Sequence, residues 1–334
     1  MRYLIAGLLL SLTLSSPAVA AKGVPIGGVD DGQGAVSARG GHRYTTHWAN
    51  GQTVVTKAAI SDGRVVRKLR LQGHYSIPLV AYDGSTSGLS ASGGTLVLFQ
   101  PRTRFPQPRT RMLVVDTRRM LVAHRIAMRG DFGFDAVAPD GSTLYLVNYL
   151  GRTETHYAVR AFDVRSGRLA GGPIVDQRNP DEKMVGVPVT RATSPDGHWA
   201  YTLYDDSGGS HPFVHALDTA GGTAFCIDLD SLEGRSDVMS LRLSVGGGGR
   251  ILTVVKADEP LAAIDTRTFA VGPPGALPAA VKERPERANG TAWWPWIAAA
   301  GALLVLATAR RLLRSGTIPT TTDPARTNES RRPL

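Results

Sequence analysis

The sequence of 334 residues contains a single cysteine, Cys226. One cysteine excludes an internal disulfide and a zinc site built from several cysteines. A domain of about 250 residues can be stabilised by its hydrophobic core without such crosslinks. Because Cys226 lies in the apolar run AFCIDL, we predict a buried core thiol, with a lipid or intermolecular disulfide anchor as the alternative.

The sequence also lacks the common catalytic signatures. It has no Gly-x-Ser-x-Gly elbow, because GSTSG at residues 84–88 places Thr86 at the nucleophile position, and it has no Walker loop and no His-Glu-x-x-His motif. His211 and His215 are four residues apart without a third ligand nearby in sequence. We therefore predict no metal site and no cofactor, and these absences favour a protein that is not an enzyme.

Basic residues are frequent but form no long run. The formal net charge is +10, and six arginines lie after residue 309. Between residues 21 and 291 no run of five lysines or arginines occurs. Such dispersed charge does not predict a nucleic-acid partner.

Acidic residues are absent from the segment between Trp293 and Leu313, which reads WWPWIAAAGALLVLATARRLL. About twenty such residues match the hydrocarbon thickness of a bilayer. We predict a transmembrane helix over residues 292–313 with a cytoplasmic C-terminus. Three tryptophans lie at its first turn, and arginines 310, 311 and 314 follow at its far end. Residues 314–334, rich in Thr, Pro and Arg, are expected to form a short cytoplasmic tail.

Residues 1–20 resemble a signal peptide. A short apolar run follows Arg2 and ends at Ala18-Val19-Ala20, the pattern that signal peptidase accepts. An uncleaved anchor helix is the alternative. With the C-terminal helix, this segment predicts a single-pass protein of the cell membrane whose body, after an N-terminal segment at 21–33, lies outside the cytoplasm.

The body of the chain repeats itself. Turn glycines recur at intervals of 53, 47, 56 and 52 residues, and apolar, alternating runs follow each of them. A period near fifty residues is typical of repeat architectures, and each unit is expected to form four short strands. In the third unit these are residues 134–138, 143–149, 157–163 and 168–175. The turn glycines are Gly41, Gly94, Gly141, Gly197 and Gly249.

An aspartate ends the third predicted strand in four of the units. A carboxylate at this position can accept hydrogen bonds from backbone amides of the next turn, so we predict a structural role for all four. These residues are Asp116, Asp163, Asp218 and Asp265.

The phrases APDGSTLYLVNY and TSPDGHWAYTLY resemble the Pro-Asp-Gly signature of TolB-like and YVTN-type repeats, which are related to the WD-repeat group. The resemblance implies an all-β fold, a β-propeller over residues 34–271. We count five four-stranded blades, or six if Val24 to Val29 contributes strands. Residues 272–291 are Pro-rich and are expected to form a stalk, with Asn289 in a glycosylation acceptor motif.

In propellers of this type, the strand before the Pro-Asp-Gly turn lines the central channel. The positions six residues before the turn glycines are Ala35, Gly88, Asp135 and Arg191, with Arg242 in the fifth unit if Gly248 is its turn glycine. Two arginines in a channel would suit a carboxylate or phosphate ligand. The alternative is that Asp135 pairs with an arginine in a purely structural ion pair.

The loops that lead into these inner strands are expected to share one rim of the propeller. Aromatic and charged side chains on one rim describe a surface for recognition. The candidate partner-binding residues are His74, Tyr75, Asp131, Phe132, Glu182, Lys183 and Arg235.

Together these features predict a membrane-anchored, extracytoplasmic propeller that acts as a binding or scaffold module for a protein or cell-envelope partner. One alternative is a carbohydrate-active hydrolase that pairs Asp135 with a carboxylate of the rim. Another is a sensor of small anions built on Arg191 and Arg242.

Overall fold

The computed structural model describes residues 33–37, 41–150, 157–181, 184–205 and 211–275. The predicted signal peptide, most of the stalk, the transmembrane helix, the tail and the strands considered at Val24 to Val29 lie outside these residues. Within the described part of the chain, no helix is long and apolar enough to span a bilayer.

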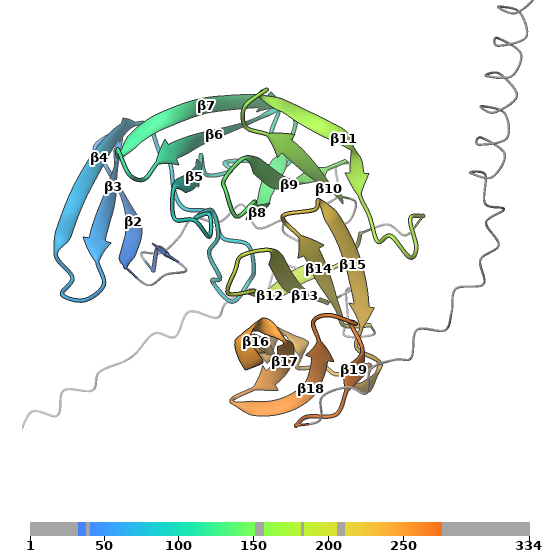
Figure 1. The fold of residues 1–334 in the computed structure, drawn as a ribbon. Helices are drawn as coiled ribbons and strands as arrows, with labels where there is room; N and C mark the ends of the chain where they lie inside the picture. The colour runs from blue at the N-terminus through green and yellow to red at the C-terminus, as the bar shows by residue number, and fades with distance from the viewer. Residues whose placement is uncertain (1–32, 38–40, 151–156, 182–183, 206–210, 276–334) are drawn as a thin grey trace, which may run out of the picture. The chain divides into compact units, whose positions relative to one another are not determined.

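Five antiparallel sheets follow one another in chain order (Figure 1). In each sheet, neighbouring strands are also neighbours in sequence, which is the meander of a propeller blade. The first sheet comprises β1 (Ala35–Val36), β2 (His42–Ala49), β3 (Gln52–Ala59) and β4 (Val65–Gln72). The second comprises β5 (Thr95–Phe99), β6 (Arg109–Asp116) and β7 (Leu121–Arg129).

The remaining three sheets each have four strands. The third comprises β8 (Phe132–Val137), β9 (Thr143–Tyr149), β10 (Tyr157–Asp163) and β11 (Arg168–Ile174). The fourth comprises β12 (Val187–Thr193), β13 (Trp199–Asp205), β14 (Phe213–Asp218) and β15 (Thr223–Asp228). The fifth comprises β16 (Arg242–Gly246), β17 (Ile251–Lys256), β18 (Glu259–Asp265) and β19 (Val271–Gly272). The predicted all-β propeller is confirmed, and the strands of the third unit lie within two residues of their predicted bounds.

The second sheet corrects the prediction of four strands in every blade. Its inner position holds only an isolated bridge between Leu89 and Leu96. Gly88, just before the bridge, has a positive φ of 109°, and a Cβ there would lie 2.9 Å from the carbonyl oxygen of Val97. This left-handed residue turns the backbone out of the extended conformation, so no regular inner strand forms.

Consecutive sheets bury their facing side chains against each other. Along β13, Tyr201 and Leu203 pack toward Leu252 of the fifth sheet, whereas Ala200 packs toward Tyr145 of the third. The alternation follows from the two-residue period of a strand, which directs successive side chains to opposite faces. The hydrophobic core is therefore a series of layers between neighbouring blades.

The four aspartates that end the third strands have the predicted role. Each carboxylate accepts hydrogen bonds from backbone amides two or three residues later in the chain, at 2.6–3.0 Å. The aspartates thus close the turn between the third and fourth strands of their sheets.

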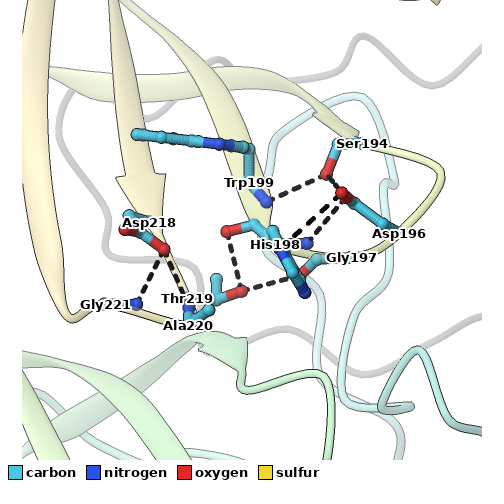
Figure 2. A network of polar contacts seen from close by, with 9 residues as sticks. All are labelled: Ser194, Asp196, Gly197, His198, Trp199, Asp218, Thr219, Ala220 and Gly221. Atoms are coloured by element: carbon cyan, nitrogen blue, oxygen red, sulfur yellow. Dashed lines mark hydrogen bonds and ion pairs between the residues drawn. The ribbon is translucent and has the colours of Figure 1, made fainter. Parts of the chain in front are cut away.

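A threonine after three of these aspartates completes the turn, a role that the sequence analysis missed. In the fourth sheet, the hydroxyl of Thr219 donates to the carbonyl oxygens of Gly197 and His198 at 2.6 and 3.0 Å (Figure 2). Thr117 and Thr266 bond equivalent carbonyls in the second and fifth sheets, and the third sheet has Val164 instead. In these three sheets the Asp-Thr pair links the turn before the second strand to the turn after the third strand, at one end of the sheet.

The turns between first and second strands approach one another closely. A Cβ on Gly141 would lie 2.1 Å from Oγ1 of Thr95, and one on Gly197 would lie 2.4 Å from Cβ of Ala91. Both glycines also have positive φ, 83° and 74°. Only glycine meets both requirements, which is the physical reason for the Pro-Asp-Gly pattern in these two units.

A short hairpin over residues 79–86 interrupts the regular order of the blades. Leu79 and Thr86 form its only bridge, and Asp83-Gly84 lies at its tip. The backbone amides of Tyr82 and Asp83 donate to carbonyls at the start of β12, at 3.0 and 3.1 Å. The segment between the first and second sheets therefore reaches the fourth sheet, across the inner strands.

We expect Thr219→Val to lower the free energy of unfolding by about 1–3 kcal/mol, because it removes a buried hydroxyl without changing the shape of the side chain. Thr219→Ser keeps the hydroxyl and should cost less. Urea denaturation of the three proteins measures the difference. Equal stability of Thr219→Val and the wild type would contradict a stabilising role for these hydrogen bonds.

Candidate functional site

A partly open central cavity of about 300 Å³ lies beside the inner strands. Residues of β1, β8 and β12 line it, together with residues of the hairpin at 79–86 and the turn that follows. Arg191 is the only charged residue among the described residues of this lining. Of the five predicted channel positions, Ala35 and Arg191 line this cavity, whereas Gly88, Asp135 and Arg242 are not among its described lining residues.

Asp135 and Arg191 form a buried ion pair between the third and fourth sheets. Their side chains are 2% and 5% exposed, and Nη2 of Arg191 donates to Oδ1 of Asp135. Nη1 of the same guanidinium donates to the backbone oxygen of Asp135 at 3.1 Å. A register shift in β8 between Phe134 and Ala136 accompanies the placement of this carboxylate.

The arginine belongs to a polar row that crosses the fourth sheet. Arg191, Thr202, His215 and Cys226 are directly paired from β12 to β15, so their side chains share the face that packs on the third sheet. Cys226 is half-buried, a correction to the predicted buried thiol. The half-exposed position follows from its place on the outermost strand of the blade.

Several buried atoms in this row and in Asp135 have no hydrogen-bond partner among the described residues. They are Oδ2 of Asp135, Nε of Arg191, Oγ1 of Thr202 and Nε2 of His215. A buried polar atom without a partner lowers the free energy of unfolding, so such atoms are rare in protein cores. Several of them lie together in this layer, which distinguishes it from the rest of the core.

Aromatic rings pack beside the polar row, toward the hairpin between β13 and β14. The ring of Tyr204 stacks on Phe213 at 5.3 Å and meets His215 edge-on at 6.3 Å. Burial holds the pKa values of Tyr157 and Tyr204 well above their ordinary range. Both phenols are neutral near pH 7.

Arg242 does not join Arg191. Its side chain is 47% exposed, and Nε lies 3.6 Å from Oδ2 of Asp83 at the tip of the hairpin. Nη1 of Arg242 also donates to the carbonyl of Leu241 at 2.7 Å. Each of the two channel arginines is thus bound to a different carboxylate, so the structure does not present them as one anion-binding pair.

The predicted rim residues divide into exposed and buried groups. His74 is half-exposed and stacks on Trp48 with ring centroids 4.6 Å apart. Tyr75 packs partly against the core between the first two sheets. Phe132 is 5% exposed in the core between the second and third sheets. Glu182 and Lys183 lie outside the described residues.

Asp131 and Arg235 are both occupied in ion pairs. Asp131 is 3% exposed, and Oδ1 lies 2.7 Å from Nη2 of Arg102. Arg235 lies 2.7 Å from Asp237, whose pKa is held well below its ordinary value by hydrogen bonds from Arg235 and Lys256. Asp131 and Phe132 therefore hold the rim together, whereas Trp48 and His74 are presented on its surface.

Potential metal ligands do not gather in the described residues, where no group of three or more His, Cys, Asp or Glu is placed to hold an ion. The two histidines that are four residues apart in the sequence lie in different environments. His211 is exposed and lies 3.4 Å from Glu233, whereas His215 is 1% exposed in the polar row.

No protein-family model matches the chain, and no curated protein matches it in sequence. Among solved structures, the chain is similar to TolB from Acinetobacter baumannii, with 16% identity and a TM-score of 0.36 over 61% of this chain and 44% of that one. It is also similar to the β-propeller domain of Cps50 (Swd1) from Myceliophteria thermophila, with 10% identity and a TM-score of 0.40 over 70% and 64%.

A functionally unknown protein from Desulfotomaculum acetoxidans has 12% identity and a TM-score of 0.43, over 74% of this chain and 69% of that one. The chain thus spans less than half of the TolB structure and about two thirds of the other two. The propeller assignment rests on the chain's own succession of meander sheets.

We expect Arg191→Met to lower the free energy of unfolding by about 3–5 kcal/mol, because it leaves the Asp135 carboxylate buried without its cation. Asp135→Leu should have a similar effect. The double variant should lose less than the sum of the two, since neither charge is then unpaired. Denaturation of the four proteins tests this cycle, and additive losses would contradict direct coupling.

The stability should also depend on the protonation of His215. Burial lowers the pKa of His215 below 6.5, while the Asp135 carboxylate and the Arg191 guanidinium act on it in opposite directions. The unfolded chain therefore binds a proton before the folded protein does. Stability from this group is fully present above about pH 6.5 and is lost as the pH falls toward the folded value.

Thermal unfolding at about pH 7.5 and about pH 5.5 measures this effect. The wild type should lose more stability between these pH values than His215→Gln, which has no imidazole to titrate. His198→Gln is a matched control, because His198 is 52% exposed in its ion pair with Asp196. Parallel losses in the wild type and His215→Gln would show that the imidazole is not responsible.

Proposed function

We propose that this chain is a membrane-anchored, extracytoplasmic β-propeller that binds a protein partner through one rim. The predicted signal peptide at 1–20 and the predicted helix at 292–313 support export and anchoring. The rim in question, called the entrance rim below, is formed by the loops that lead into the inner strands and by the hairpins between second and third strands.

The observation that carries the proposal is the exposure of large apolar side chains on the entrance rim. Trp48 is 50% exposed at the end of β2, and Leu150 is 63% exposed at the end of β9. Three further exposed side chains occur in the loops before the second, fourth and fifth sheets. They are Tyr82, Val185 and Met239.

Trp48 is the best candidate for an anchor residue. Its ring stacks on His74 with an interplanar angle of 22°, so the exposed indole is held in one orientation. A preorganised tryptophan loses little conformational freedom on binding, and tryptophan is enriched among the residues that dominate interface energies. A partner would therefore bury this ring.

The core of the propeller favours binding over hydrolysis. A glycosidase needs two carboxylates that are free to reach one sugar ring. Asp135 is bound to Arg191, and Asp131 is bound to Arg102. Both carboxylates are nearly fully buried, so neither is presented to a substrate.

Site-specific photo-crosslinking in cells that express the full chain tests the proposal. A benzoylphenylalanine at position 48 should give one discrete protein adduct, because the entrance rim contacts the partner. The same residue at position 121 is the matched control, because Leu121 is 42% exposed at the start of β7, next to the turn between the third and fourth strands at the opposite rim. A probe at position 239 should give the same adduct as position 48.

Equal adducts from positions 48 and 121, or none from either, would contradict a partner on the entrance rim. Anchoring has a separate readout. A chain ending at Thr291 should leave the membrane fraction, whereas the full chain should stay there with its propeller sensitive to protease added outside the cell.

A further inference from the structure

Positive charge is concentrated in the first two sheets. Residues 41–130 contain 14 lysines and arginines but three acidic residues, whereas residues 131–275 contain 12 and 19. The net charge of +10 for the whole chain does not show this difference between the two regions. An unbalanced basic region attracts anions.

Four of these arginines surround one surface depression. It has a volume of about 620 Å³ and lies between the segment at 100–108 and strands β6 and β7. Arg104, Arg109, Arg111 and Arg129 line it, and the described residues of its lining include no aspartate or glutamate. None of the four forms an ion pair with a residue that the structure describes.

The pairing of β6 with β7 places like charges face to face. Arg109 is directly opposite Arg129, and Arg111 follows two residues later on the same face as Arg109. Like charges directly opposite each other in a sheet are destabilising. Their repulsion is relieved when an anion lies between them, so the arrangement suits a ligand and disfavours the empty surface.

Ion-pair and hydrogen-bond contacts fix the position of the segment at 100–108 that forms one wall of the depression. The guanidinium of Arg102 lies 2.7 Å from Asp131 and 4.9 Å from the ring centroid of Tyr149. The other carboxylate oxygen of Asp131 accepts the amide of Gln107 at 2.8 Å. The amide of Gly130 donates to the carbonyl of Pro108 at 2.9 Å. The segment that carries Arg104 is thus fixed to the strand entering the third sheet.

We propose that this depression binds a multivalent oxyanion, a compound with two or more phosphate groups. A guanidinium presents a planar fork of N–H donors that matches phosphate oxygens. Four such groups without an acidic neighbour in the lining match several negative charges at once, and Thr103 adds a hydroxyl. The site is separate from the central cavity, and its ligand does not depend on the proposed protein partner.

Isothermal titration of the full chain with inorganic tripolyphosphate tests the site, with sulfate as a single-anion comparison. The wild type should bind one tripolyphosphate more tightly than sulfate. Arg109→Gln and Arg129→Gln should each raise the Kd at least about tenfold, because a hydrogen bond to a charged group contributes an order of magnitude or more in affinity. Arg125→Gln, an exposed change on the same strand as Arg129 but outside the depression, should change it by less than about twofold.

A second measurement separates binding from folding. Without added anion at low salt, Arg129→Gln should unfold at the same temperature as the wild type or higher, because one of two opposed charges is removed. The absence of binding by tripolyphosphate would overturn the proposal. Equal weakening by Arg125→Gln and Arg129→Gln would also overturn it, since that result indicates diffuse attraction to the basic region. Equal affinity for sulfate would overturn the multivalent character of the ligand.

Discussion

The structure depends on the packing of each sheet against the next sheet in the chain. A four-stranded meander with apolar residues on two faces is unstable alone, and each sheet here covers one face of the next. Close approach of the turns near the inner strands makes this packing possible, and glycines at 141 and 197 leave room for Thr95 and Ala91. The Asp-Thr pairs at the ends of third strands then fix the hairpins whose faces pack together.

The interface between the third and fourth sheets contains a buried ion pair and a buried imidazole. Asp135, Arg191 and His215 lie between two apolar clusters of this interface. A buried ion pair contributes little net stability after desolvation, yet it strongly disfavours any register that separates the charges. The pair therefore favours the alignment of these two blades in which both charges are paired.

The entrance rim combines rigid support with an uneven surface. Arg102 and Asp131 are buried beneath it, and both aromatic and cationic side chains are exposed on its surface. Trp48 and His74 present an aromatic surface on the first sheet, and the arginine depression follows on the second. A propeller allows this division because each blade contributes its own loops to a shared rim while its core stays unchanged.

The sequence by itself determined the repeat, the strands of the third unit and the role of the aspartates, because strand alternation and turn chemistry are local and act within a few residues. It identified Asp135 and two arginines as channel residues, but only the tertiary structure decided that Arg191, 56 residues away, is the partner and that Arg242 pairs with Asp83. The same holds for the buried positions of Asp131 and Phe132, the course of the hairpin at 79–86 and the arginine depression. These features join segments that are distant in the chain, and their geometry depends on how whole sheets pack, which no local pattern records.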